Sequence, residues 1–260
     1  MKIAFSTLGC PDWSWDDILA TAKDLGFDGI ELRGIGNEIY VPKAKPFSEE
    51  NLNATIERLK KLKLELPCIT SSCFLFDKEN TDYYLNEGRD YIDLASKLGV
   101  KYVRVLGDAT PEPSDNIDID FVADNLTTLS KYASGKNVII LIETNGVFAD
   151  SDRMLELIEK VNSPSVGVLW DVHHPYRFMG ESVEITYSAL KEYIMFVHVK
   201  DSKVEDGKVK YKMMGYGDVP VKEALQLLKE NGYQGYVSLE WVKRWNKDLE
   251  EPGIVFSHYL

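Results

Sequence analysis

The chain has few cysteines, few histidines and no long apolar segment, and each shortage excludes a class of protein. Cys10, Cys68 and Cys73 are an odd and widely spaced set, so we expect reduced, packed thiols and not a disulfide framework. No apolar run approaches the roughly 20 residues of a membrane span, and no basic segment leads into an apolar stretch with a cleavage site. We therefore predict a soluble cytoplasmic protein that does not act at a membrane.

Positive charge is also in short supply. Lys and Arg number 30 against 42 Asp and Glu, which gives a net charge of −12. This balance disfavours general attraction to nucleic acid or to anionic membranes, although a local basic groove remains compatible with it. No Ser-, Gly- or Pro-rich linker interrupts the chain, and about 250 residues is typical of one α/β barrel. We predict a single domain over residues 1–260.

Strand-like and helix-like segments alternate about eight times along the chain. The spacing of Ile18, Leu19 and Ala22 is typical of a helix with one apolar face, and Ser14 with Asp17 predicts a capping box before it. Pro220 suits the first turn of a later helix. Eight such units predict a (β/α)8 TIM barrel, with a doubly wound open sheet as the alternative. The predicted strands begin near Ile3, Gly29, Leu64, Lys101, Val138, Val166, Ile194 and Gly235.

An internal echo supports the repeat. Residues 25–32 and 231–236 both place a Gly just past a helix, then an aromatic residue, a polar residue and a second Gly before a strand. The first Gly can adopt the left-handed conformation that ends a helix, and the second permits tight entry into the sheet.

Four strand-like segments in the second half of the chain end in residues that bind metals. Glu143, Asp171, His198 and Glu240 each follow a short apolar run. In a barrel of parallel strands such ends meet at one rim. Any one of them is more often a cap or a salt-bridge partner, but together they predict a site for one divalent ion. Mn²⁺ is our first choice, and Mg²⁺, Co²⁺ and Zn²⁺ are also compatible with these ligands.

The chain resembles the xylose isomerase-like TIM barrels, the sugar phosphate isomerase/epimerase superfamily that also includes endonuclease IV. The resemblance covers nearly the whole chain, and its specific parts are the Asp-x-x-His and His-Val-Lys-Asp motifs. The matching stretches are residues 6–13, 29–33, 143–146, 171–174, 198–201, 215–218 and 238–241.

The resemblance implies roles for five residues. In the ketose epimerases of the family, the residues matching Glu143, Asp171, His198 and Glu240 hold one divalent metal ion, and the residue matching His174 reaches the substrate. A metal that chelates neighbouring substrate oxygens stabilises the enediolate formed when a proton leaves the carbon between them. Glu143 and Glu240 would then be ligands and catalytic acid and base at once. His174 could instead orient Asp171.

Several other residues are candidates for substrate binding, each with a structural alternative. Trp13 could form an apolar wall against a sugar ring, whereas Trp15 fits the buried face of the first helix. Glu31 and Arg33 end the second strand, where they could bind hydroxyls or an anion or form a rim salt bridge. Lys200 could hold a phosphate or carboxylate, or stay solvated.

The loops contain three further features. Arg177 and Arg244 are possible anchors for an acidic group. Residues 215–218 could cradle an oxyanion or form a tight turn. Residues 204–209 predict a small hairpin that turns on Asp206-Gly207.

The chain departs from the family pattern at several positions. Ketose 3-epimerases carry an arginine where this chain has Val204 and a glutamate where it has Ala149, so a narrow 3-epimerase assignment does not follow. Endonuclease IV needs more histidines than the four present here, which disfavours DNA repair.

Three functions fit these observations. The first is a metal-dependent isomerase or epimerase of a sugar, sugar phosphate or related polyol. The second is a lyase or dehydratase on the same site, because relatives act on 3-dehydroshikimate, inosose or C-glycosides after the same proton abstraction. The third is a non-catalytic sugar-binding barrel. The expected binding partner is a small carbohydrate-like molecule. The family resemblance also implies a homo-oligomer.

Overall fold

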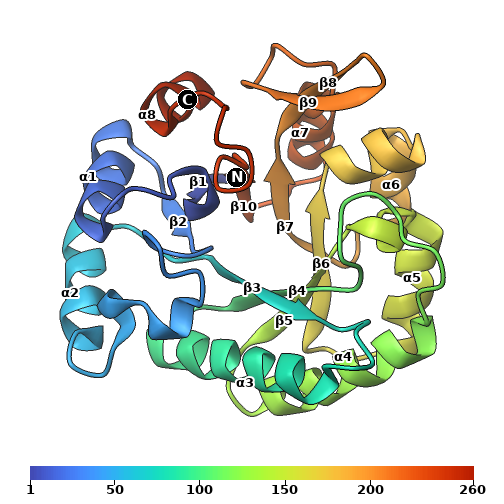
Figure 1. Ribbon diagram of the computed structural model, residues 1–260, viewed down its shortest axis with the longest axis horizontal. Helices are drawn as coiled ribbons and strands as arrows, with labels where there is room; N and C mark the ends of the chain where they lie inside the picture. Colours follow the sequence, from blue (N-terminus) through green and yellow to red (C-terminus); the bar gives the residue numbers. More distant parts are fainter.

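The computed structural model describes residues 1–260 and shows eight parallel strands surrounded by helices (Figure 1). The predicted (β/α)8 barrel is confirmed. The barrel strands are β1 (Lys2–Ser6), β2 (Gly29–Glu31), β3 (Cys68–Phe74), β4 (Tyr102–Leu106), β5 (Ile139–Glu143), β6 (Val166–Asp171), β7 (Ile194–Val199) and β10 (Tyr236–Leu239). The helices are α1 (Trp15–Leu25), α2 (Leu52–Leu62), α3 (Thr81–Leu98), α4 (Ile119–Ser134), α5 (Ser151–Val161), α6 (Val183–Leu190), α7 (Val221–Glu230) and α8 (Pro252–Tyr259). None of the helices combines the length and apolar character that crossing a bilayer requires.

The strands are ordered β2-β1-β10-β7-β6-β5-β4-β3 around the barrel. The last seam, between β2 and β3, is closed only by isolated bridges that pair Gly29 with Glu65 and Leu32 with Ile69. Its backbone hydrogen bonds include one of 2.9 Å from the Ile30 amide to the Glu65 carbonyl. The barrel is therefore closed, but this seam holds less regular pairing than the others.

The helices carry the apolar faces that their spacing predicts. Ile18, Leu19 and Ala22 of α1 are buried against the strands. The capping box that opens this helix is present, because the Ser14 side chain accepts from the Asp17 amide and the Asp17 carboxylate accepts from the Ser14 amide. One detail differs from the prediction, since Pro220 is the N-cap of α7 and lies one residue before its first turn.

Two glycines of the repeated motif do what the sequence predicts. Gly26 ends α1 with a φ of 82°, a left-handed conformation that residues with a Cβ seldom adopt. At Gly29 a Cβ would lie 2.9 Å from the Tyr236 ring and 3.0 Å from the Glu65 carbonyl oxygen. The strand therefore enters the sheet where only a hydrogen fits.

The interior of the barrel has two layers of different character. The lower layer is apolar and is formed by Ala4, Cys68, Leu141, Leu169, Phe196 and Tyr236. Side chains alternate along a strand, so residues two further on point the same way. On β5, β6 and β7 these are Glu143, Asp171 and His198, which begin a polar layer at the carboxyl ends of the strands.

A two-stranded hairpin, β8 (Asp201–Glu205) and β9 (Lys208–Lys212), follows β7 and projects from the barrel beside α7 (Figure 1). It turns on Asp206 and Gly207, both of positive φ, as predicted. The loop after it returns to the barrel because the Asp201 carboxylate accepts from the amides of Gly215 and Gly217, among others. The amides that we considered as a cradle for an external oxyanion thus bind a carboxylate of the chain itself.

Candidate active site

The four predicted metal ligands meet at the carboxyl end of the barrel. Glu143 and Asp171 are the last residues of β5 and β6, His198 is the last but one of β7, and Glu240 follows β10 directly. One potential ligand atom from each lies within 4.8 Å of all the others, and all four side chains are buried. The sequence separation of nearly 100 residues between the first and the last is bridged by parallel strands that are neighbours in the sheet.

His198 lies at the centre of this cluster. Its Nε2 is 2.9 Å from Glu31 Oε2, and a carboxylate accepts, so Nε2 donates the proton. Its Nδ1 has no hydrogen-bond partner and faces three carboxylate oxygens, at 3.5 Å from Glu240 Oε1, 3.8 Å from Glu143 Oε1 and 3.9 Å from Asp171 Oδ2. A buried nitrogen directed at three acidic oxygens but bonded to none is the arrangement of a cation site.

The carboxylates that surround His198 favour a positive charge at the centre of the cluster. Burial alone would lower the pKa of His198, but the carboxylates of Glu31 and Glu240 hold it well above its ordinary value. A proton on the imidazole is one way to supply the missing charge. A divalent cation would supply it instead and take the Nδ1 lone pair, and three carboxylates with one imidazole suit such an ion. The residues present therefore fit a divalent metal.

Two buried cations accompany the glutamates. Arg104 Nε lies 3.0 Å from Glu143 Oε2, and Lys200 Nζ contacts Asp171 Oδ2 and lies 2.5 Å from Glu240 Oε2. Burial would raise the pKa of Glu143, but the Arg104 guanidinium and His198 together outweigh burial and lower the pKa to about 2. The pKa of Glu240 is likewise lowered, with burial opposed chiefly by Lys200. Both glutamates are ionised at neutral pH, as metal ligands must be.

Arg104 is a site residue that our sequence analysis missed. It lies in β4, the strand Tyr102–Leu106, where its neighbours Val103 and Val105 are both fully buried. A single charged residue within an apolar strand was the available signal, because a charge at such a position needs a buried partner. That partner, Glu143, comes from the next strand.

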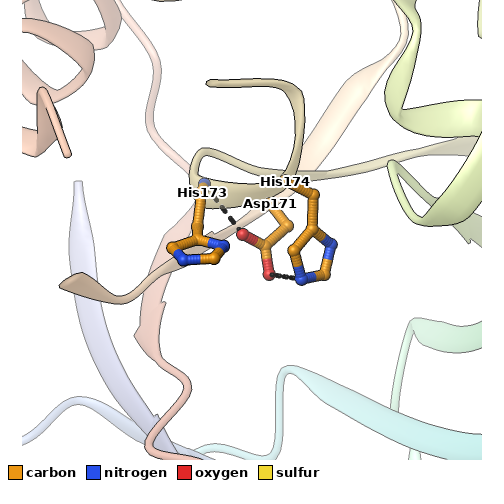
Figure 2. Close-up of side chains that lie close together, drawn as sticks. All are labelled: Asp171, His173 and His174. Carbon is orange, nitrogen blue, oxygen red and sulfur yellow. Dashed lines mark hydrogen bonds and ion pairs between the residues drawn. The ribbon is translucent and has the colours of Figure 1, made fainter. Parts of the chain in front are cut away.

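His174 reaches the cluster from the loop after β6 (Figure 2). Its Nδ1 donates to the Thr144 carbonyl at 2.9 Å, which leaves Nε2 unprotonated, 3.5 Å from Asp171 Oδ2. Burial lowers the pKa of this histidine. The ring is thus neutral, with a free acceptor beside a ligand carboxylate, and it lies on the wall of the cavity described below.

His173 flanks the other side of Asp171 in Figure 2, with its backbone amide donating to Asp171 Oδ1 at 2.9 Å. Asp171, His173 and His174 also have potential ligand atoms within 4.8 Å of one another. However, His173 Nε2 is 2.9 Å from the Ser202 hydroxyl, and the ring stacks on Tyr211. His173 therefore ties β6 to the hairpin.

A cavity of about 390 Å³ opens above the cluster. Of the predicted site residues, Glu143, Glu240, His174, Lys200 and Arg33 line it, and so does Arg104. Glu31 does not; it is fully buried below, where it holds His198. The wall also contains residues that sequence analysis did not single out, namely Leu8, Phe74, Leu106, Ala109, Thr110, Pro111, Asn145, Tyr211, Val242, Trp245 and Asn246.

The structure does not bring Trp13, Arg177 or Arg244 to the cavity. Trp13 is half-buried and meets Phe256 edge-on, with ring centroids 5.7 Å apart. Arg177 donates to the Ser202 carbonyl at 3.0 Å and pairs with Asp218. Its guanidinium fastens the loop after β6 to the segment that follows the hairpin.

Comparison with known proteins agrees with this fold. The family model for the xylose isomerase-like TIM barrel matches residues 19–254. The match covers most of the sequence, from the first helix to the last. The chain belongs to that family.

Among curated relatives, fructoselysine 3-epimerase from Shigella flexneri is 23% identical over 265 residues, covering 97% of this chain and 93% of the relative. Among solved structures, the IOLI protein with a bound zinc atom has a TM-score of 0.81 at 21% identity and covers 100% of this chain and 95% of its own. A probable 3-DHS dehydratase of petrobactin synthesis from Bacillus anthracis has a TM-score of 0.78 at 19% identity, covering 95% of each chain. At these identities the solved structures support the fold.

Proposed function

We propose that this chain is a divalent-metal-dependent isomerase or epimerase that acts on a sugar, a sugar phosphate or a related polyol. The observation that carries the proposal is the cluster of Glu143, Asp171, His198 and Glu240, with ligand atoms within 4.8 Å at the base of a cavity. The curated similarity to fructoselysine 3-epimerase over almost the full length of both chains supports this reaction class.

The two glutamates are placed to act from different sides. Glu143 comes from β5 and Glu240 from the end of β10, and two strands, β6 and β7, separate them in the barrel. Each has one carboxylate oxygen held by a cation, Arg104 or Lys200, and the other directed towards His198. One carboxylate would remove a proton from a substrate carbon and the other would return a proton to it or to its neighbour. Proton transfer by a placed carboxylate typically contributes about 10²–10⁴-fold in rate.

The other residues of the cavity bind and orient. When bound, the metal would supply Lewis-acid polarisation of the substrate oxygens. His174 Nε2 is a free acceptor for a substrate hydroxyl, because its Nδ1 is engaged with Thr144. Glu31 fixes the ring orientation of His198 through Nε2, the role that a carboxylate behind a metal-binding histidine usually has. Mn²⁺ remains our first choice, with Mg²⁺, Co²⁺ or Zn²⁺ as alternatives.

A dehydratase is the second candidate, and likeness in fold to the Bacillus anthracis protein favours it over other lyases. The first step would be the same proton removal by Glu143 or Glu240. The glutamate that took the proton would then return it to the departing hydroxyl, which leaves as water. The product would carry a new double bond, which absorbs in the ultraviolet.

The test is to load the purified protein with Mn²⁺ and offer ketoses, sugar phosphates, inososes and 3-dehydroshikimate in deuterated water. Incorporation of deuterium at a substrate carbon, detected by nuclear magnetic resonance, supports an isomerase or epimerase. New ultraviolet absorbance supports the dehydratase. If Glu240→Gln abolishes turnover but still binds ligand, a purely sugar-binding barrel is excluded. If the protein binds no divalent ion by calorimetry, the proposed function is wrong.

A further inference from the structure

Among the arginines near the mouth of the barrel, Arg33 and Arg244 have no counter-charge in contact, and Arg33 is the more buried of the two. Arg104 is paired with Glu143, and Arg177 is paired with Asp218. Arg244 is half-buried and donates to the Gly36 carbonyl. Arg33 is 7% exposed, lines the cavity and forms no ion pair.

The contacts of Arg33 leave part of its guanidinium free. Nη2 donates to the Ser72 hydroxyl at 2.6 Å, whereas Nη1 is buried and has no hydrogen-bond partner. The nearest acidic link is indirect, because the Ser72 amide donates to Glu87 Oε1. A buried charge without a partner is costly, so its retention calls for an explanation. The rim salt bridge that would explain it is absent.

The carboxylates on the cavity wall are paired with cations other than Arg33. Glu143 pairs with Arg104, and Glu240 pairs with Lys200, which also contacts Asp171. Burial, followed by the nearby Arg104, lowers the pKa of Arg33 to about 10, which still leaves it charged at neutral pH. Arg33 is therefore a charged group on the cavity wall with no acidic side chain in contact.

The position of Arg33 places this charge one layer above the cluster. It lies two residues beyond Glu31, which touches His198, and two residues of extended chain rise about 7 Å. That is the length of a short carbon chain between oxygens at the base of the cavity and a group near its mouth. Trp245 covers this position, with its ring centroid 5.8 Å from the Arg33 guanidinium carbon.

We propose that Arg33 and Trp245 form a subsite for an oxyanion carried by the substrate, so that the substrate is an acidic carbohydrate derivative. The planar guanidinium with a free Nη1 can meet two oxygens of a carboxylate or phosphate side by side. The ring of Trp245 covers the apolar part of the substrate next to that group. The inference rests on the proposed function, because it assigns one end of the substrate to the cavity described above.

The experiment compares matched ligands by calorimetry with and without Mn²⁺. D-fructose is the neutral member, fructose 6-phosphate is the phosphate arm and fructuronate is the carboxylate arm. We expect the wild type to bind at least one charged member at least tenfold more tightly than fructose. Arg33→Gln should remove most of that preference, and Arg33→Lys should restore it in part. The arm that binds more tightly identifies the oxyanion.

The same substitution at a distant position is the control. Arg58→Gln on α2 changes an exposed arginine paired with Asp16 and should leave all three affinities within twofold. Arg33→Gln should retain the wild-type Mn²⁺ affinity and melting temperature, and the charged ligand should raise that temperature in the wild type alone. Three outcomes overturn the proposal: the wild type binds neither fructose 6-phosphate nor fructuronate, it binds them no more tightly than fructose, or Arg33→Gln keeps the full preference for the charged ligand. If the wild type does not bind Mn²⁺, the result counts against the proposed function instead.

Discussion

The two layers inside the barrel are carried by the same strands but differ in almost every property. Leu141, Leu169 and Phe196 form part of the lower layer, and the residues two positions further on, Glu143, Asp171 and His198, form part of the upper one. The lower layer is apolar and packed. The upper layer is charged, and its side chains are held by other charged groups. Alternation along a strand therefore lets one strand both fill the core and place a reactive group about 7 Å away.

The comparison indicates that the lower layer of the barrel interior stabilises the fold, whereas the upper layer, at the carboxyl ends of the strands, carries the reactive groups. Removing atoms from the lower layer should cost free energy of unfolding and leave metal affinity alone. Changing a charge in the upper layer should alter metal affinity or turnover and leave the free energy of unfolding nearly unchanged. Four substitutions test this separation, beginning with the largest expected effect.

Glu240→Gln should have the largest effect, on turnover. It removes a proposed metal ligand and one of the two proposed proton-transfer groups, so we expect at least about a 10³-fold loss in rate. The measurement is deuterium incorporation into the substrate. Glu57→Gln, at an exposed position on α2, is the matched control and should turn over normally. Normal turnover in Glu240→Gln would contradict the proposed mechanism.

Leu141→Ala tests the lower layer. Leu141 is fully buried, and such a truncation typically costs about 2–5 kcal/mol in the free energy of unfolding. We expect this loss in urea denaturation, with Mn²⁺ affinity unchanged in the folded protein. Ile185→Ala on α6, where the side chain is exposed, should stay within about 0.5 kcal/mol of the wild type. Weakened Mn²⁺ binding in Leu141→Ala would show that the layers are coupled.

Glu31→Gln tests the support behind His198. The amide can still accept from Nε2, but the negative charge that favours the imidazole as a ligand is lost. Substitutions behind a metal ligand typically lower metal affinity by about 10–100-fold. Calorimetry with Mn²⁺ measures this, and the melting temperature of the metal-free protein is the control. An unchanged affinity would mean that Glu31 does not act through His198.

Ser14→Ala lies in neither layer and should give the smallest effect. It removes the capping box of α1, which costs about 1 kcal/mol in the free energy of unfolding. Urea denaturation measures the loss, and both turnover and Mn²⁺ affinity should equal those of the wild type. A change in either would show that α1 influences the site, contrary to the separation described above.

The fold and the meeting of the four proposed ligands at one end of the barrel could be predicted because their signals are local. Each ligand follows an apolar run, and the parallel topology brings the ends of such runs together. The bond between Glu31 and His198 joins residues 167 positions apart and depends on the curvature of the barrel, which no local pattern contains. The sequence predicts Trp13 at the site and does not single out Trp245, which lines the cavity, for a related reason. Both lie in loops, and the path of a loop decides which ring faces the cavity.

The sparse pairing between β2 and β3 has a consequence for substrate range. Arg33 follows β2, so the wall that bears it is attached through the least regular edge of the cylinder. We expect small backbone rearrangements at this wall to leave β5, β6 and β7 in place, because those strands are joined by continuous parallel ladders. Molecules of different length could then be accommodated without disturbing the reacting end, and amide hydrogens along this edge should exchange before those of the opposite side.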